Sequence, residues 1–110
     1  MDLAALDHDR LAELETEIGA EDLRQVLDMF LQEAVDAVST LRDDLSAGEY
    51  AKSMHFLRSG ALNLGLAALA REARRIAALP DRERRAATVG PDLARAIEEG
   101  RTAVAARLFG

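Results

Sequence analysis

The 110-residue sequence contains no cysteine and no tryptophan, and it has only one tyrosine, three phenylalanines and two prolines. Without cysteine the chain can form no disulfide and no thiolate metal site, and it has no thiol nucleophile. This composition fits a reducing cytoplasm, which is the compartment we expect.

Long hydrophobic runs are also missing. No apolar stretch approaches the roughly 20 residues that a membrane-spanning helix needs. The first ten residues, MDLAALDHDR, do not combine a basic start with an apolar segment as a secretion signal does. The sequence therefore predicts a soluble, unexported protein with no membrane partner.

The residues that are present favour helices. Hydrophobic residues make up 49% of the chain and charged residues 31%, with alanine, leucine, arginine and glutamate prominent. A chain of 110 residues suits one domain with one core, so we take residues 1–110 as a single helical domain.

Charge is distributed unevenly along the chain. Residues 1–50 carry 14 acidic and 3 basic side chains, whereas residues 51–110 carry 6 acidic and 11 basic ones. No aromatic residues interleave the arginines between residues 71 and 85, and the whole chain has a net charge of −6, so we do not expect a nucleic-acid partner. We expect the two halves to pair with each other instead.

Apolar residues at spacings of three and four predict five helices. Glycine and proline separate these segments, and Asp7 is the expected N-cap of the first. The second segment is expected to be the longest, the fifth to begin at Gly90–Pro91, and residues 81–89 to form a loop or a frayed helix end. The predicted segments are 7–19, 21–48, 49–64, 66–79 and 90–108.

These helices predict an all-α fold. The apolar stripes of the last four segments can close on one core, which favours an antiparallel four-helix bundle with the short N-terminal helix packed across it. We expect no strand.

The stretch MHFLRSGALNLG, residues 54–65, contains one of two histidines. Stepping about 100° per residue along a helix gathers its apolar residues on the side opposite His55. That side must meet the core, so His55 is predicted to face solvent. The apolar set is Tyr50, Met54, Leu57, Ala61 and Leu64.

A solvent-facing imidazole is a candidate nucleophile that can accept a phosphoryl group. Lys52 and Arg58 lie three residues to either side, within reach of the negative charge that such a group would bring. Ser59 and Gly60 are small and leave room for a partner to approach. Leu62 is apolar but is predicted to be exposed, as a docking residue would be.

The stretch HFLRSGALNLG resembles the signature of histidine-containing phosphotransfer (HPt) domains, and the resemblance extends to DMFLQEA upstream and LAALARE downstream. It implies a cytoplasmic, monomeric carrier in a two-component phosphorelay. The carrier would move a phosphoryl group on His55 between aspartates of response-regulator receiver domains, or receive it from a hybrid histidine kinase. No cofactor is implied for the carrier, because the Mg²⁺ belongs to the receiver.

Two positions depart from the family pattern, in which lysine and glycine usually stand where this chain has Arg58 and Ser59. Arginine keeps the charge but changes its geometry. Met29 and Glu33 lie about where the family packs against the histidine, and are candidates for the border of the site. His8, in the triplet DHD, has no second histidine nearby, and we expect no metal site.

Two alternatives to the relay carrier remain. A CheA-type phosphotransfer domain would take its phosphoryl group from a kinase module, and a plain helical interaction module would make no use of the histidine. A histidine kinase dimerisation domain is disfavoured because Phe56, not an acid, follows His55. The chain also lacks a glycine-rich loop for ATP, so we expect no autokinase activity.

Overall fold

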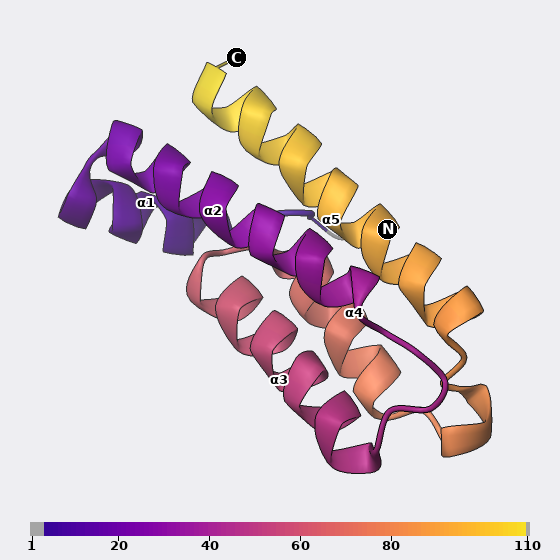
Figure 1. The fold of residues 1–110 in the computed structure, drawn as a ribbon. Coiled ribbons are helices and arrows are strands. Elements are labelled where there is room, and N and C mark those ends of the chain that lie inside the picture. Colours follow the sequence, from indigo (N-terminus) through magenta and orange to yellow (C-terminus); the bar gives the residue numbers. More distant parts are fainter. Residues whose placement is uncertain (1–3, 110) are drawn as a thin grey trace.

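The computed structural model describes residues 4–109, and within that range the chain forms five α-helices, one short 3₁₀ helix and no strand (Figure 1). The all-α fold class is therefore confirmed. None of the helices in this range is long and apolar enough to cross a bilayer. The helices are α1 (His8–Ile18), α2 (Ala20–Ser39), α3 (Ala47–Asn63), α4 (Ala67–Ala77) and α5 (Ala86–Phe109), with the 3₁₀ helix η1 at Asp81–Glu83.

The helices surround one core. α3 packs against α4, α4 against α5, α5 against α2 and α2 against α3, while α1 packs on α2. Figure 1 shows α2 and α5 lying side by side, with α3 and α4 beneath them. The core is built mainly from leucine, and its fully buried large side chains are Leu11, Leu23, Leu27, Leu31, Leu57, Leu66, Leu69, Ile76, Val89, Leu93 and Ile97.

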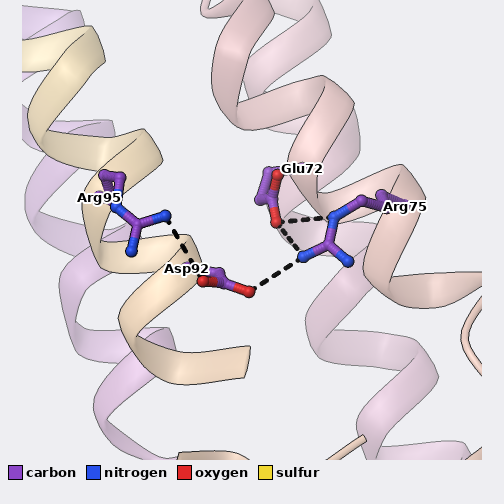
Figure 2. A network of polar contacts seen from close by, with 4 residues as sticks. All are labelled: Glu72, Arg75, Asp92 and Arg95. Carbon is purple, nitrogen blue, oxygen red and sulfur yellow. Dashed lines mark hydrogen bonds and ion pairs between the residues drawn. The ribbon is translucent and has the colours of Figure 1, made fainter. Parts of the chain in front are cut away.

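A chain of ion pairs joins α4 to α5 (Figure 2). The Arg75 guanidinium bonds to Glu72 one turn away and donates to Asp92 Oδ2 at 3.1 Å, and Arg95 lies 3.6 Å from the other oxygen of Asp92. All four residues belong to the basic half of the sequence. The expected pairing between the two halves is largely replaced by such pairs within one half: Arg85, whose guanidinium lies 3.9 Å from the Asp43 carboxylate, makes a contact that crosses, whereas Arg42 pairs with Asp44 and Arg101 with Glu98.

α2 ends earlier than the sequence predicts. The predicted segment ran to residue 48, but the helix stops at Ser39, where the hydroxyls of Ser39 and Thr40 donate to the carbonyls of Asp36 and Ala37. Leu41, which continues the apolar spacing, is nevertheless buried as a member of the core, although it lies beyond the end of the helix. The apolar spacing therefore predicted correctly that Leu41 is buried, but wrongly placed it in a helix.

α5 begins earlier than predicted, and at 24 residues it, not α2, is the longest helix. The Gly90–Pro91 pair was expected at its start, but Pro91 lies inside the helix. The added first turn is capped by Asp43, whose Oδ1 accepts the Ala86 N–H at 2.7 Å. It also contributes Val89, which is 1% exposed, to the core. Tertiary contacts therefore outweigh the proline signal.

Contacts around Tyr50 join the start of α3 to the segment that follows η1. The Arg84 guanidinium lies over the Tyr50 ring, 5.1 Å from its centroid, and donates from Nε to the Leu79 carbonyl at 2.8 Å. The Tyr50 hydroxyl is buried without a hydrogen-bond partner among the described residues. Burial raises the pKa of Tyr50, and the positive charge of Arg84 acts in the opposite direction. This cluster anchors η1 beneath the start of α3.

Candidate functional site

α3 carries His55, and its ends are well defined. The Ser46 hydroxyl accepts the Glu49 N–H at 3.1 Å and donates to the Glu49 carboxylate, which caps the N-terminus. At the other end Gly65 adopts a φ of +73°, a conformation that favours glycine. A Cβ at this position would lie 3.0 Å from Leu11 Cγ and 3.1 Å from the Asp7 carbonyl oxygen. The absence of a side chain at Gly65 therefore also lets α1 pack closely against this end of α3.

A second contact holds α1 against this end of α3. Arg10 donates from Nε to the Asn63 carbonyl at 2.9 Å and from Nη2 to the Asn63 side-chain oxygen at 3.1 Å. The carbonyl is one of those left unpaired at a helix C-terminus. The helix that carries the histidine is therefore fixed at both ends.

His55 is exposed, as the helical spacing predicts. The opposite face of α3 is buried through Tyr50, Met54, Leu57 and Ala61, which leaves the imidazole pointing away from the core. Its Nε2 atom lies 3.4 Å from the Ser59 hydroxyl oxygen, one turn further along the helix.

A groove of about 560 Å³ lies beside the histidine, between α2 and α3. Its apolar wall combines side chains from both helices, and His55, Lys52, Ser59 and Glu33 supply polar groups around it. Met29 is 64% exposed, and with the exposed Val26 and Phe56 it forms apolar surface in the groove. The lining residues are Val26, Met29, Phe30, Glu33, Lys52, His55, Phe56, Ser59, Gly60, Asn63 and Leu64.

Two aromatic rings form part of the groove wall. The rings of Phe30 and Phe56 lie 5.6 Å apart between centroids and are inclined at 44°. Phe30 reaches this position because Gly60 has no side chain: a Cβ there would lie only 2.1 Å from Phe30 Cε1. Gly60, expected to leave an open surface for a partner, thus also makes room for a ring of the protein's own.

Two cations flank the imidazole along α3. Lys52 and Arg58 are both exposed, and neither forms an ion pair with any other residue in the range 4–109. Their charges are therefore available to an incoming anion. Most other arginines of the basic half, such as Arg75 and Arg84, are held by carboxylates.

No protein family, curated protein or solved structure matches this chain.

The predicted site residues fall into two groups. Met29, Glu33, Lys52, Ser59 and Gly60 line the groove together with His55. Arg58 and Leu62 do not line it and stand elsewhere on the exposed surface of α3, with Leu62 56% exposed.

Five lining residues were not among the predicted site residues: Val26, Phe30, Phe56, Asn63 and Leu64, of which Leu64 was expected only on the core face of its helix. Phe56 follows the histidine by about 100° around the helix, which turns it toward α2. Val26 lies one turn before Met29 on α2, and Asn63 two turns after His55 on α3. Each could have been found by asking which residues adjoin a predicted site residue by one or two turns.

Within residues 4–109, no three histidine, aspartate or glutamate side chains are grouped so that they could hold a metal ion. The site as described consists of an exposed imidazole, two unpaired cations, a hydroxyl and an apolar groove. Chemically, this arrangement can present a neutral nitrogen nucleophile to a partner and offset negative charge placed on it.

Proposed function

We propose that this chain is a histidine phosphotransfer protein of a two-component phosphorelay, with His55 as the phosphorylated residue. The observation that carries the proposal is the exposed imidazole at the edge of an apolar groove, with the unpaired cations Lys52 and Arg58 on either side. The resemblance of residues 55–65 to the HPt signature supports it. An antiparallel four-helix topology for α2 to α5, with α1 added, belongs to the same proposal.

The reaction requires little from the carrier beyond position. A neutral imidazole nitrogen attacks the phosphorus of a receiver's aspartyl phosphate, the new N–P bond forms, and the P–O bond to the aspartate breaks. The electron pair of that bond leaves with the aspartate carboxylate. No proton has to move, because the other ring nitrogen keeps its own. The divalent metal is expected on the receiver, and Arg58, Lys52 and Ser59 would support the phosphoryl oxygens.

The proposed partners are response-regulator receiver domains, a hybrid histidine kinase, or both. We place the protein in the cytoplasm as a monomer, without nucleic-acid or membrane partners and without a cofactor of its own. In this proposal the protein is a phosphocarrier and has no autokinase activity.

A CheA-type phosphotransfer domain is the first alternative, and it differs only in the donor, which would be a kinase module. A helical interaction module is the second, and in it the histidine would be incidental. The groove beside His55 is compatible with either, so only the chemistry separates them.

The deciding experiment mixes the purified protein with receiver domains charged by acetyl phosphate. Transfer of label to this chain, with the acid lability and base stability of phosphohistidine, supports the carrier. An absence of label from every receiver, combined with labelling by a kinase module, would favour the CheA-type alternative. No label from either source would leave the interaction module.

Arg58→Ala is expected to slow phosphoryl transfer without stopping it. An exposed charge interaction is worth about 0.2–1 kcal/mol, which corresponds to a rate decrease of up to about fivefold. The measurement is the single-turnover rate of transfer from a charged receiver. Arg74→Ala, which removes an exposed arginine from α4, is the matched control. Equal rates for Arg58→Ala and the wild type would remove Arg58 from the site.

Leu62→Glu and Met29→Glu are expected to weaken receiver binding, because both side chains are exposed and apolar, Met29 in the groove with His55 and Leu62 two turns further along α3. Burying such a residue at an interface is worth about 1–2 kcal/mol, so each change should raise the dissociation constant about tenfold. Binding is measured by titration, and the melting temperature of each free variant is measured alongside.

Ala105→Glu on α5 is the control for added charge, since Ala105 is exposed and α5 packs against α2 and α4. If only Met29→Glu weakens binding, the docking face is the groove alone and Leu62 has no part in it. If Leu62→Glu unfolds the protein, its side chain is needed for packing and the docking proposal for it is wrong.

A further inference from the structure

The Ser59 hydroxyl is the one polar group in hydrogen-bonding contact with the imidazole among the described residues, at 3.4 Å from His55 Nε2. A hydroxyl has one proton to donate and two lone pairs to accept with. Neutral imidazole carries its proton on one nitrogen only, so Nε2 is either a donor or an acceptor in this contact. Which of the two it is determines where the nucleophilic lone pair lies.

A hydroxyl inside a helix can donate to a carbonyl of the preceding turn, as Thr16 does to the Ala12 carbonyl at 3.0 Å. Ser53, Thr88 and Thr102 form no such bond among the described residues. Ser59 makes no such bond within residues 4–109, so its proton is free for Nε2. A neutral imidazole that accepts this proton at Nε2 must carry its own hydrogen on Nδ1.

We propose that Ser59 is a positioning residue that favours the Nδ1–H tautomer of His55 and so leaves Nε2 as the nucleophile. The proposal rests on the proposed phosphocarrier function for its consequence in transfer, whereas its consequence for the tautomer stands alone. It assigns a role to Ser59, at a position where the resembled family usually has glycine.

The same hydroxyl has a second position to occupy during transfer. As the Nε2 lone pair forms the N–P bond, the Ser59 hydroxyl can no longer donate to it. The hydroxyl can rotate and donate instead to an oxygen of the phosphoryl group that is now bound to Nε2. The P–O bond to the receiver aspartate breaks, its electron pair stays with the carboxylate, and Nδ1 keeps its hydrogen. The hydrogen bond to Nε2 is given up in this step, so the tautomer preference alone does not speed the attack. Transfer gains from Ser59 only because the hydroxyl then donates to the phosphoryl oxygen.

The test measures the tautomer directly in the unphosphorylated full chain, by ¹H–¹⁵N NMR of the two ring nitrogens with the imidazole neutral. Ser59→Ala is expected to lower the ratio of Nδ1–H to Nε2–H about two- to threefold, the lower part of the range for one hydrogen bond. Ser59→Thr, which keeps the hydroxyl, should restore the wild-type ratio. Ser53→Ala removes a hydroxyl elsewhere on α3 and should change nothing.

An unchanged or raised ratio of Nδ1–H to Nε2–H in Ser59→Ala would overturn the proposal. Transfer rates are measured on the same variants, and Ser59→Ala should accept phosphoryl groups about two- to threefold more slowly. A shifted tautomer with an unchanged rate would overturn the role of Ser59 in transfer. If the wild type accepted no phosphoryl group, the phosphocarrier function would fail, and the NMR ratio would still decide whether Ser59 positions the ring.

Discussion

His55→Gln is expected to abolish phosphoryl acceptance and to leave the melting temperature within about 3 °C of the wild-type value. Glutamine has no ring nitrogen with a free lone pair, so no N–P bond can form. The imidazole is exposed, and its side chain makes only the long hydrogen bond to Ser59 among the described residues, so its removal costs little packing. The measurements are incorporation of label from a charged receiver and thermal unfolding followed by circular dichroism.

His8→Gln is the matched control, because His8 is also exposed and opens α1, away from the groove. It should be labelled like the wild type. Label that persists in His55→Gln would show that another residue is phosphorylated. A loss of stability above about 2 kcal/mol would show that the imidazole takes part in packing, against the exposure described.

The face of α3 could be predicted because it depends on one helix alone. A period of 3.6 residues fixes which side chains share a face, and the apolar side must meet the core whatever its neighbours are. This places His55 and Leu62 outside and Leu57 inside, as found. The cap at Asp7 was predictable for the same reason, since its side chain accepts the Arg10 N–H within its own helix.

The errors in helix bounds arose where distant parts of the chain meet. Leu41 continues the apolar spacing of α2 and is buried, but it lies beyond the end of the helix, in the segment that leads to α3. Pro91 has the signal of a helix start, and the turn before it forms because Asp43, more than forty residues earlier, caps Ala86. No local pattern contains that pairing, so the sequence alone could not place either boundary.

The groove depends on how α2 and α3 are rotated and spaced relative to each other, which periodicity does not determine. Met29 and Glu33 were predicted at its border through the family resemblance, not through their spacing. No sequence pattern around Gly60 indicates that an aromatic ring from α2 lies against it. Contacts of this kind appear only once both helices are placed, and they decide the shape of the surface beside His55.

Gly60→Ala is expected to destabilise the protein by up to about 2 kcal/mol. Alanine favours a helix interior over glycine by about 1 kcal/mol, but overpacking a core typically costs about 1–3 kcal/mol. Here the new Cβ would lie 2.1 Å from Cε1 and 2.6 Å from Cζ of Phe30, so the ring must move. Phe30 is only 7% exposed and lines the groove, so its free direction is into the groove, away from the core. The steric term therefore outweighs the helix propensity.

The measurement is the free energy of unfolding in denaturant, for a double-mutant cycle of Gly60→Ala with Phe30→Leu. If the ring causes the penalty, Gly60→Ala should cost little in the Phe30→Leu background. Gly48→Ala on the same helix is the matched control: the nearest atom to its Cβ, Ser46 Oγ, is 4.0 Å away, so it should stabilise the protein by up to about 1 kcal/mol. An equal penalty for Gly60→Ala in both backgrounds would show that Phe30 is not its cause. Because the displaced ring would occupy the groove, Gly60→Ala should also weaken receiver binding, which Gly48→Ala should leave unchanged.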